Sequence, residues 1–246
     1  MKKLVAYITT GFPDREFTVD CALALGEAGV DTLELGIPFS DPVADGPVIE
    51  SANLKALQRG FRLADLFDVS RQIAPNVETL WMGYFNPFYH KGMDHFIAEA
   101  TAAEVKGFII PDLPYEEAQS YTPQIEKAGL DLIDFIAPTD TPERIAMIAK
   151  DARRFLYLVA YAGITGSGQK EDLAPVIARI RQHTDTPVYV GFGVNEETAK
   201  EKAQGVDGVI VGSAFVKVLL DESLSHDEKI RSVAEMARVI KEKINE

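Results

Sequence analysis

The sequence predicts a parallel α/β barrel, a (β/α)8 or TIM barrel, in which eight strand–helix units close on themselves. Short apolar runs rich in β-forming residues alternate with longer segments of helical period along the whole chain. The strand runs are continuously apolar, which is typical of parallel strands buried on both faces. Eight units in 246 residues match a closed barrel better than an open doubly wound sheet, which usually has fewer strands.

No shift in composition and no linker divides the chain, so we expect residues 1–246 to form one domain. The expected strands are Leu4–Thr10, Thr32–Ile37, Leu80–Tyr84, Gly107–Pro111, Asp131–Ala137, Phe155–Tyr161, Val188–Gly191 and Gly208–Val211. The expected helices are Glu16–Ala28, Ile49–Arg59, Leu63–Ile73, Met93–Glu104, Tyr115–Lys127, Pro142–Asp151, Leu173–Gln182, Glu196–Ala203 and segments from Ala214–Leu220 through Ile244. Thr141 is expected to cap the helix that follows it.

Composition and charge exclude several classes of protein. The net charge of −13 argues against a surface for nucleic acid or for an anionic membrane, although backbone N–H groups can still bind a phosphate locally. The single cysteine, Cys21, allows no disulfide within the chain and no CxxC metal site. The start of the chain has no signal-peptide pattern, and no apolar run reaches eighteen residues. We therefore expect a soluble, cytoplasmic protein.

Two carboxylates flank the segment where the second expected strand becomes a loop. Glu34 lies inside the apolar strand, where an acid is costly unless it is paired or protonated. Asp45 lies on the loop between Pro42 and Pro47, which stiffen the chain. A barrel strand that ends in a rigid acidic loop is suited to acid–base chemistry. The alternatives are a structural ion pair for Glu34 and a turn-forming role for Asp45.

The ends of the other strands carry further candidates, because active sites of this fold lie at the carboxyl ends of the strands. Polar residues there are Thr9, Thr10, Asn86, Asp112 and, within the sixth strand, Tyr157. Glycine clusters follow the last three strands, in Gly163–Gly168, Gly191-Phe192-Gly193 and Gly212-Ser213. Glycine lets the backbone approach a ligand closely, and a helix begins at Ala214. This pattern predicts a phosphate site.

Other chemistries are not supported by the sequence. The segment from Gly163 to Lys170 lacks the Gly-Lys-Ser/Thr of a P-loop, and no nucleophile elbow, dinucleotide fingerprint or HExxH pair is present. The four histidines have no metal-ligand spacing, and the expected strand interiors contain no lysine for a Schiff base. We therefore expect chemistry on carboxylates, with no metal and no covalent cofactor.

The segment Leu33–Pro47 closely resembles the signature of the tryptophan synthase alpha subunit. The resemblance covers almost the whole chain and includes Thr10–Pro13, Tyr84–Pro87, Pro111–Pro114, Gly163–Gly166, Gly191–Gly193 and Gly212–Ala214. It implies retro-aldol cleavage of indole-3-glycerol phosphate to indole and glyceraldehyde 3-phosphate. In that family, indole passes to a beta subunit, which carries pyridoxal phosphate and joins indole to serine, within an alpha–beta–beta–alpha complex.

The resemblance also implies roles for individual residues. Glu34 and Asp45 would be the catalytic acids: Glu34 would move protons, and Asp45 would stay ionised and accept the indole N–H. Tyr157 would position Glu34 or the substrate hydroxyls. The remaining residues are Gly166, Gly193, Gly212 and Ser213 for the phosphate, Tyr7, Met82 and Phe192 for the walls of the indole pocket, and Thr165 for a lid.

The chain departs from the family pattern at two places. Family members usually carry a helix before the first strand, whereas that strand begins here at Leu4. We therefore expect either a floor of the barrel that is covered differently or a greater reliance on a partner. Ala160 stands where the lid usually has a serine. We expect a beta subunit to dock on the loops Pro38–Pro47 and Asn86–His90.

The alternatives are a lyase that acts alone and an inert barrel that activates its partner. Sugar-phosphate epimerases share the last glycines, but they typically use metal-binding histidines at strand ends, which are missing here.

Overall fold

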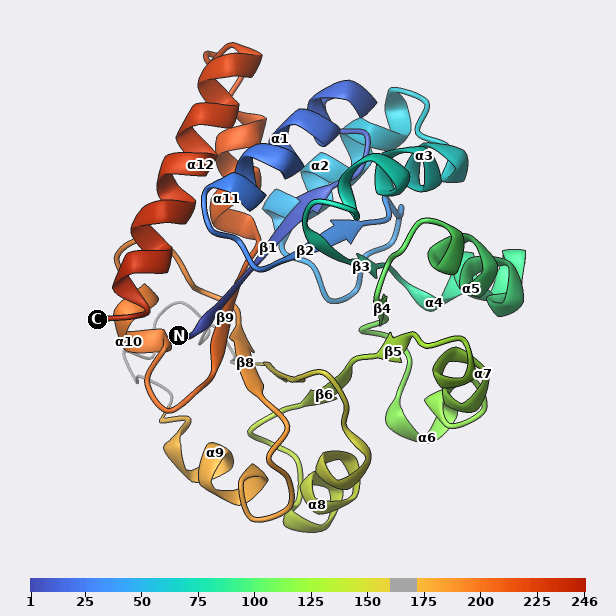
Figure 1. The fold of residues 1–246 in the computed structure, drawn as a ribbon, viewed down its shortest axis with the longest axis vertical. Coiled ribbons are helices and arrows are strands. Elements are labelled where there is room, and N and C mark those ends of the chain that lie inside the picture. The colour runs from blue at the N-terminus through green and yellow to red at the C-terminus, as the bar shows by residue number, and fades with distance from the viewer. Residues whose placement is uncertain (160–171) are drawn as a thin grey trace.

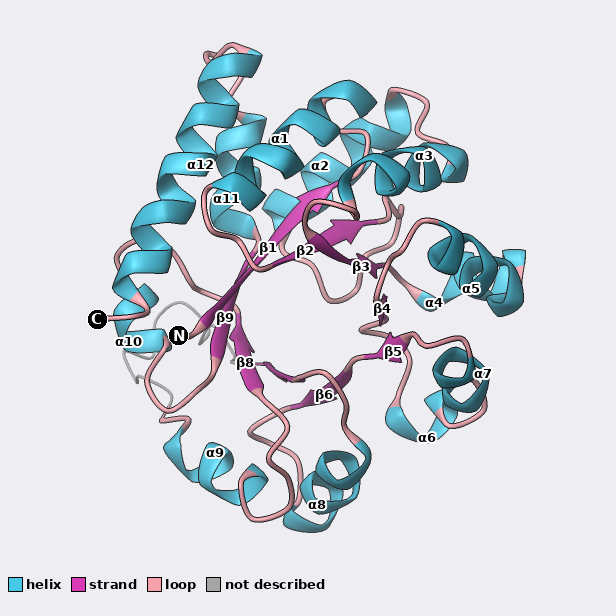
Figure 2. Ribbon diagram, in the orientation of Figure 1, coloured by secondary structure: helices cyan, strands magenta, loops and turns pink. Residues whose placement is uncertain are grey.

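The computed structural model describes residues 1–159 and 172–246, which form a parallel sheet wrapped into a barrel (Figures 1 and 2). The order of its strands is β5-β4-β3-β2-β1-β9-β8-β7-β6, and every paired strand is parallel. The strands are β1 (Lys3–Thr9), β2 (Thr32–Gly36), β3 (Glu78–Met82), β4 (Gly107–Ile109), β5 (Asp131–Leu132), β6 (Asp134–Ile136), β7 (Leu156–Val159), β8 (Val188–Gly191) and β9 (Gly208–Val211).

The two ends of this sheet are consecutive parts of one segment. β5 pairs with β4, β6 pairs with β7, and only Ile133 separates them. The Ile133 N–H donates to the Phe108 carbonyl at 2.9 Å, so the chain continues the barrel through this residue. β5 and β6 together occupy the place of one barrel strand, which gives the eight positions that the sequence predicts.

Helices surround the sheet on its outer side (Figure 2). They are α1 (Arg15–Glu27), α2 (Pro47–Gln58), α3 (Leu63–Ile73), α4 (Phe85–Lys91), α5 (Met93–Ala102), α6 (Tyr115–Ala118), α7 (Thr122–Lys127), α8 (Pro142–Asp151), α9 (Ala174–Ile180), α10 (Ala199–Lys202), α11 (Ser213–Leu220) and α12 (His226–Lys243). The Thr141 hydroxyl accepts from the Arg144 N–H, which confirms the predicted cap. Among the described residues, no helix is long and apolar enough to cross a membrane.

Alternate residues of each strand face the two sides of the sheet, and both sides are apolar. One buried cluster fills the barrel interior, and its members are Val5, Leu80, Ile109, Ile133, Phe155, Tyr189 and Ile210. The other, larger cluster lies between the sheet and the helices and includes Leu33, Leu35, Trp81 and Phe108. Because both faces are packed, a charged side chain that points into this sheet must lie in a site or be paired.

Two of the expected elements are wrong in ways that proline explains. The expected strand through Tyr84 ends at Met82, and Asn86–His90, expected as a loop, belongs to α4. Pro87 lies in the first turn of α4, where its missing N–H costs nothing. The expected helix Tyr115–Lys127 is divided into α6 and α7, because Pro123 begins a new helix and cannot continue the earlier one.

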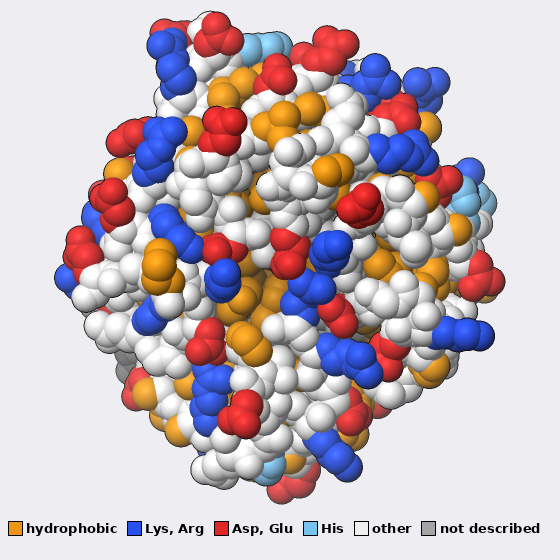
Figure 3. Space-filling view, viewed as in Figure 1, with side chains coloured by type: hydrophobic (Ala, Val, Ile, Leu, Met, Phe, Trp, Pro, Cys, Tyr) orange, Lys and Arg blue, Asp and Glu red, His pale blue; other side chains and the backbone are white. Residues whose placement is uncertain are grey.

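Charged side chains cover the floor of the barrel, at the amino ends of the strands. Figure 3 shows a hollow over the middle of the molecule, with hydrophobic side chains at its base and acidic and basic side chains around it. A cavity of about 360 Å³ is lined there by Lys3, Asp31, Thr32, Glu78, Asp131, Arg154 and Tyr189. These side chains form a charged rim around the hollow.

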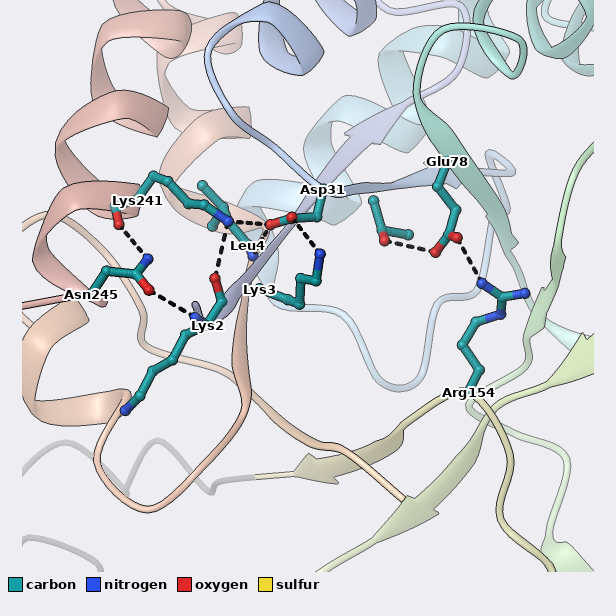
Figure 4. A network of polar contacts seen from close by, with 9 residues as sticks. Lys2, Lys3, Leu4, Asp31, Glu78, Arg154, Lys241 and Asn245 are labelled. Carbon is teal, nitrogen blue, oxygen red and sulfur yellow. Dashed lines mark hydrogen bonds and ion pairs between the residues drawn. The ribbon is translucent and has the colours of Figure 1, made fainter. Parts of the chain in front are cut away.

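The rim is a network of ion pairs between different strands and loops (Figure 4). Arg154 bridges Glu78, at 2.7 Å, and Asp131, at 2.8 Å, and therefore links β3 to β5. Asp31 pairs with Lys3 at 3.0 Å and with Lys241 of α12. Burial alone would raise the pKa of Asp31, but hydrogen bonds from Lys241, the Leu4 N–H and Lys3 outweigh it and hold that pKa below its usual value.

Asp134 is a second unusual acid, outside the barrel interior. It lies on β6 near Asp151 and Glu126, and no hydrogen bond or ion pair reaches its carboxylate from residues 1–159 or 172–246. Burial, followed by the repulsion from Asp151 and Glu126, raises the pKa of Asp134 from 3.8 to about 7. Ionised Asp134 therefore opposes folding.

We predict that Asp134→Asn stabilises the protein at alkaline pH. Between pH 3.8 and about 7 the unfolded chain releases this proton while the folded chain keeps it, so stability falls as pH rises through that window. Removing the carboxylate should raise the free energy of unfolding by about 2 kcal/mol at pH 8, and by less at pH 5. Urea unfolding at both pH values measures this, with exposed Asp185→Asn as control. An equal effect at both pH values would contradict the prediction.

Candidate active site

Glu34 is a carboxyl group buried inside the barrel near its carboxyl-end mouth. It is 2% exposed on β2, and its neighbours across the sheet are Tyr7 on β1 and Leu80 on β3. Its Oε1 makes no hydrogen bond within the described part of the chain. Burial, and then the charge of Asp45, raises the pKa of Glu34 from 4.5 to about 8. Glu34 is therefore mainly protonated at pH 7 and can donate a proton.

Asp45 lies on the loop between β2 and α2 and faces the same space. Burial raises the pKa of Asp45 from 3.8 to about 6, while hydrogen bonds from Tyr84 and Asn53 limit the rise. The Tyr84 hydroxyl also accepts from the Ala44 N–H at 3.1 Å, and Asn53 Nδ2 donates to Asp45 Oδ2 at 3.5 Å. Asp45 is therefore mainly ionised at pH 7, and the two acids differ in protonation state.

The residues that hold Asp45, Tyr84 and Asn53, are not among the site residues predicted from the sequence. Tyr84 was expected to end a strand, whereas it precedes the first turn of α4. Asn53 lies on α2 among Ile49, Ala52 and Ala56, and all four side chains are buried. A polar amide on the buried face of an apolar helix is the signal that could have identified Asn53, because such a group requires partners.

Two tyrosines approach the acids, and each uses the space of a glycine on the next strand. A Cβ atom on Gly191 would overlap the ring of Tyr157, and one on Gly36 would overlap the hydroxyl end of Tyr7. The Tyr157 ring stacks on Phe135, with centroids 4.9 Å apart. Burial, then Glu34 and Asp45, raises the pKa of Tyr157 well above 10, so this hydroxyl stays protonated beside both acids.

Two of the glycines expected at a phosphate, Gly193 and Gly212, lie in the turns after β8 and β9. Gly193 follows β8 with a φ of +72°, and Gly212 follows β9 and precedes α11, whose first residue is Ser213. A Cβ atom on Gly212 would lie 3.6 Å from Tyr7 Cβ, which places this turn next to the acid-bearing strands. Gly166 and Thr165 lie outside the described residues. The N–H groups at the start of α11 can bind an anion.

The expected pocket walls occupy different environments. Met82 is half-buried and packs against the cluster that fills the barrel interior. Phe192 is 40% exposed and has a φ of +79°, a backbone conformation that is uncommon outside glycine and is often found at functional sites. Phe192 and Ala44 line a cavity of about 580 Å³ that continues over Phe135. The lining of this cavity does not include Glu34, Asp45 or Tyr157.

The other strand-end candidates differ in their partners, and the buried Thr10 hydroxyl has none within residues 1–159 and 172–246. The Asp112 carboxylate accepts from the Phe85 N–H at 2.8 Å and so holds the start of α4. Thr9 and Thr10 are buried, and Asn86 is exposed on α4. Among the described residues, no group of three histidine, cysteine, aspartate or glutamate side chains could hold a metal ion.

Comparison with known proteins gives one family along the whole chain. Residues 1–245 match the family model of the tryptophan synthase alpha chain. The tryptophan synthase alpha chain of Wolinella succinogenes is 58% identical over 246 residues, which cover 100% of this chain and 96% of that one. The Microcystis aeruginosa alpha chain is 42% identical over 98% of this chain and 93% of its own.

Solved structures agree with this result. A Mycobacterium tuberculosis tryptophan synthase structure has a TM-score of 0.88 at 35% identity, covering 99% of this chain and 92% of that chain. The tryptophan synthase subunit alpha of Campylobacter jejuni has a TM-score of 0.86 at 30% identity, covering 96% and 95%.

We predict that the two acids titrate separately, Glu34 near pH 8 and Asp45 near pH 6. Carbon-13 NMR of the labelled carboxyl groups, assigned with Glu34→Gln and Asp45→Asn, measures both values. Tyr84→Phe removes a donor to Asp45, so it should move the lower titration upward and leave the upper one near 8. A Glu34 titration near its ordinary pKa of 4.5 would contradict the burial described here.

Proposed function

Because this chain belongs to the tryptophan synthase alpha chain family, which cleaves indole-3-glycerol phosphate to indole and glyceraldehyde 3-phosphate, we propose that Glu34 and Asp45 carry out this cleavage as a pair. The observation that carries the proposal is the buried Glu34 carboxyl. One of its oxygens has no hydrogen-bond partner within residues 1–159 and 172–246, and the charge of Asp45 acts on it. The alpha chain of this family works without a cofactor, and pyridoxal phosphate belongs to the beta chain.

The first step of the reaction requires an acid. Protonated Glu34 gives its proton to C3 of the indole ring, which makes C3 tetrahedral and leaves a positive charge at the ring nitrogen. Ionised Asp45 accepts the hydrogen bond of that N–H and stabilises the charge. The pKa values of about 8 and about 6 supply these two protonation states at neutral pH.

The second step requires a base in the same place. The Glu34 carboxylate left by the first step takes the proton of the glycerol hydroxyl next to C3, so an aldehyde forms as the carbon–carbon bond breaks. The bonding electrons return to the ring, neutralise the nitrogen and release indole. Glu34 ends protonated, as it began, so no other proton carrier is needed.

Binding of the substrate phosphate is proposed for the turns after β8 and β9. Gly193 and Gly212 present backbone N–H groups, and Ser213 begins α11 and offers a hydroxyl. Gly166 joins this set on the sequence resemblance alone, as does Thr165 as part of a lid. Tyr7, Met82 and Phe192 would contact the indole ring, and Tyr157 would orient Glu34 or the glycerol hydroxyls.

A beta subunit is the proposed partner, in an alpha–beta–beta–alpha complex. Val43, on the loop after β2, is 81% exposed, and Tyr89, on α4, is 71% exposed. Both belong to segments that follow neighbouring strands at the carboxyl-end face of the barrel. Two large apolar side chains exposed beside a barrel mouth are typical of a surface that a partner covers.

We predict that Glu34→Gln and Asp45→Asn each lower kcat for indole release from indole-3-glycerol phosphate by at least about a hundredfold. Each substitution removes a charge or proton that the mechanism uses but keeps the shape of the side chain. Steady-state indole release, with and without a cognate beta subunit, measures the effect. Wild-type cleavage that the beta subunit leaves unchanged would favour a lyase acting alone. No cleavage by wild type in either condition would favour an activator of the partner.

Tyr89→Ser should weaken the stimulation by the beta subunit and leave the basal cleavage rate unchanged. The side chain exposes an apolar ring on the proposed docking surface, whereas Glu34 is buried in the barrel. Titration of beta subunit against indole release gives the apparent affinity, which we expect to fall about tenfold. Met147→Ser, at a 40% exposed residue on α8, is the matched control. Equal behaviour of the two variants would exclude Tyr89 from the interface.

A further inference from the structure

Tyr7 carries a hydroxyl that an indole-pocket wall does not need. The side chain is 3% exposed on β1, and its Oη lies 3.4 Å from Thr9 Oγ1 and 3.4 Å from Asn53 Oδ1. Gly36 leaves the room that this hydroxyl occupies. A buried hydroxyl is costly unless it is hydrogen-bonded, so its partners show what it does.

Asn53 connects this hydroxyl to the acid loop. The amide is 1% exposed on α2; its Oδ1 faces Tyr7 and also accepts from Thr9 Oγ1 at 3.5 Å. Its Nδ2 donates to Asp45 Oδ2, also at 3.5 Å. The amide therefore has its oxygen toward β1 and its N–H groups toward the carboxylate.

The hydroxyls decide which way the amide points. A primary amide can exchange the places of its oxygen and nitrogen by a rotation of its terminal bond. Tyr7 and Thr9 both offer O–H donors, which favour the amide oxygen on their side. The reverse orientation would turn the amide oxygen toward the Asp45 carboxylate, and two acceptors would then repel each other.

We propose that Tyr7, together with Thr9, is a positioning residue that acts through Asn53 to hold the Asp45 carboxylate in place for the indole N–H. This inference rests on the role proposed above for Asp45. Asp45 lies on an irregular loop, whereas Tyr7 and Thr9 belong to β1, the strand paired with both β2 and β9. The hydrogen bonds through Asn53 therefore connect the Asp45 carboxylate, which lies on a loop, to the central strand of the sheet.

Such a role affects turnover more than substrate binding. The charge on the indole nitrogen develops after C3 is protonated, so misplaced Asp45 should lower kcat and leave KM nearly unchanged. Loss of the Asn53 donor should also move the acid limb of the kcat profile to higher pH, because that hydrogen bond holds the pKa of Asp45 down.

The test is the pH dependence of indole release from indole-3-glycerol phosphate by the full chain carrying Tyr7→Phe, Thr9→Val, Asn53→Leu or their pairs. Tyr7→Phe keeps the ring; we expect kcat to fall about three- to tenfold, with KM within about twofold. Tyr189→Phe is the matched control, because its ring also lies in the barrel interior but lines the cavity at the floor. That variant should match wild type.

Pairs of substitutions show whether Tyr7, Thr9 and Asn53 act through one connected set of hydrogen bonds or independently. Tyr7→Phe should add nothing in the Asn53→Leu background, because the amide through which it acts is gone. Tyr7→Phe with Thr9→Val should lose more than the product of the single losses, because one remaining hydroxyl still holds the amide in part, whereas the double variant has neither donor. This second pair decides the matter if Asn53→Leu does not fold.

Two results would overturn the inference: an unchanged kcat and acid limb in Tyr7→Phe, or losses that multiply independently in both pairs. The Asp45→Asn variant distinguishes a failure of the role proposed for Asp45 from a failure of the positioning role alone. Full activity in Asp45→Asn would remove the proposed role of Asp45 itself. An inactive Asp45→Asn beside unaffected Tyr7 and Asn53 variants would remove only the positioning role.

Discussion

The site depends on keeping two carboxyl groups largely out of water without pairing either one to a cation among the described residues. Such burial favours the neutral acid, and the extent differs between the two positions. Glu34 is enclosed by the barrel, and no donor from the described part of the chain reaches its Oε1, so its pKa rises to about 8. Asp45 receives donors from Tyr84 and Asn53, so its pKa rises only to about 6. The difference in hydrogen bonding thus leaves one carboxyl group protonated and the other ionised at neutral pH.

Much of the fold follows from the sequence because local and global preferences agree. Apolar runs at regular intervals give the strands in their correct order, and the structure confirms the barrel. The errors in the helix boundaries come from prolines, because a proline can either interrupt a helix or lie in its first turn. Pro87 and Pro123 were interpreted within a loop and within a helix, yet each lies in the first turn of a helix. Ile133 itself gives no sequence signal for the interruption, because it is a β-branched apolar residue like those inside the other strands.

The acids were predictable from the sequence and their supports were not. Glu34 is conspicuous because a charge interrupts an apolar strand, and Asp45 because prolines stiffen its loop. The roles of Asn53 and Tyr84 become visible only in the folded structure, where α2 and the turn after β3 both contact the loop that carries Asp45. The space that Gly36 and Gly191 leave for tyrosine rings likewise depends on the register between neighbouring strands, which periodicity alone does not specify.

The interruption at Ile133 has a mechanical consequence. In the order of the sheet, β1 stands in the middle, and β5 and β6 are the two ends, four strands away on either side. Of the proposed acids, Glu34 lies on β2 and Asp45 lies on the loop after it, whereas the proposed phosphate turns follow β8 and β9. The two regions therefore lie on opposite sides of β1 in the order of the sheet. The junction at Ile133 therefore lies on the side of the barrel opposite β1. An unbroken set of hydrogen-bonded strands joins the two reactive regions, so their spacing is set without the junction at Ile133.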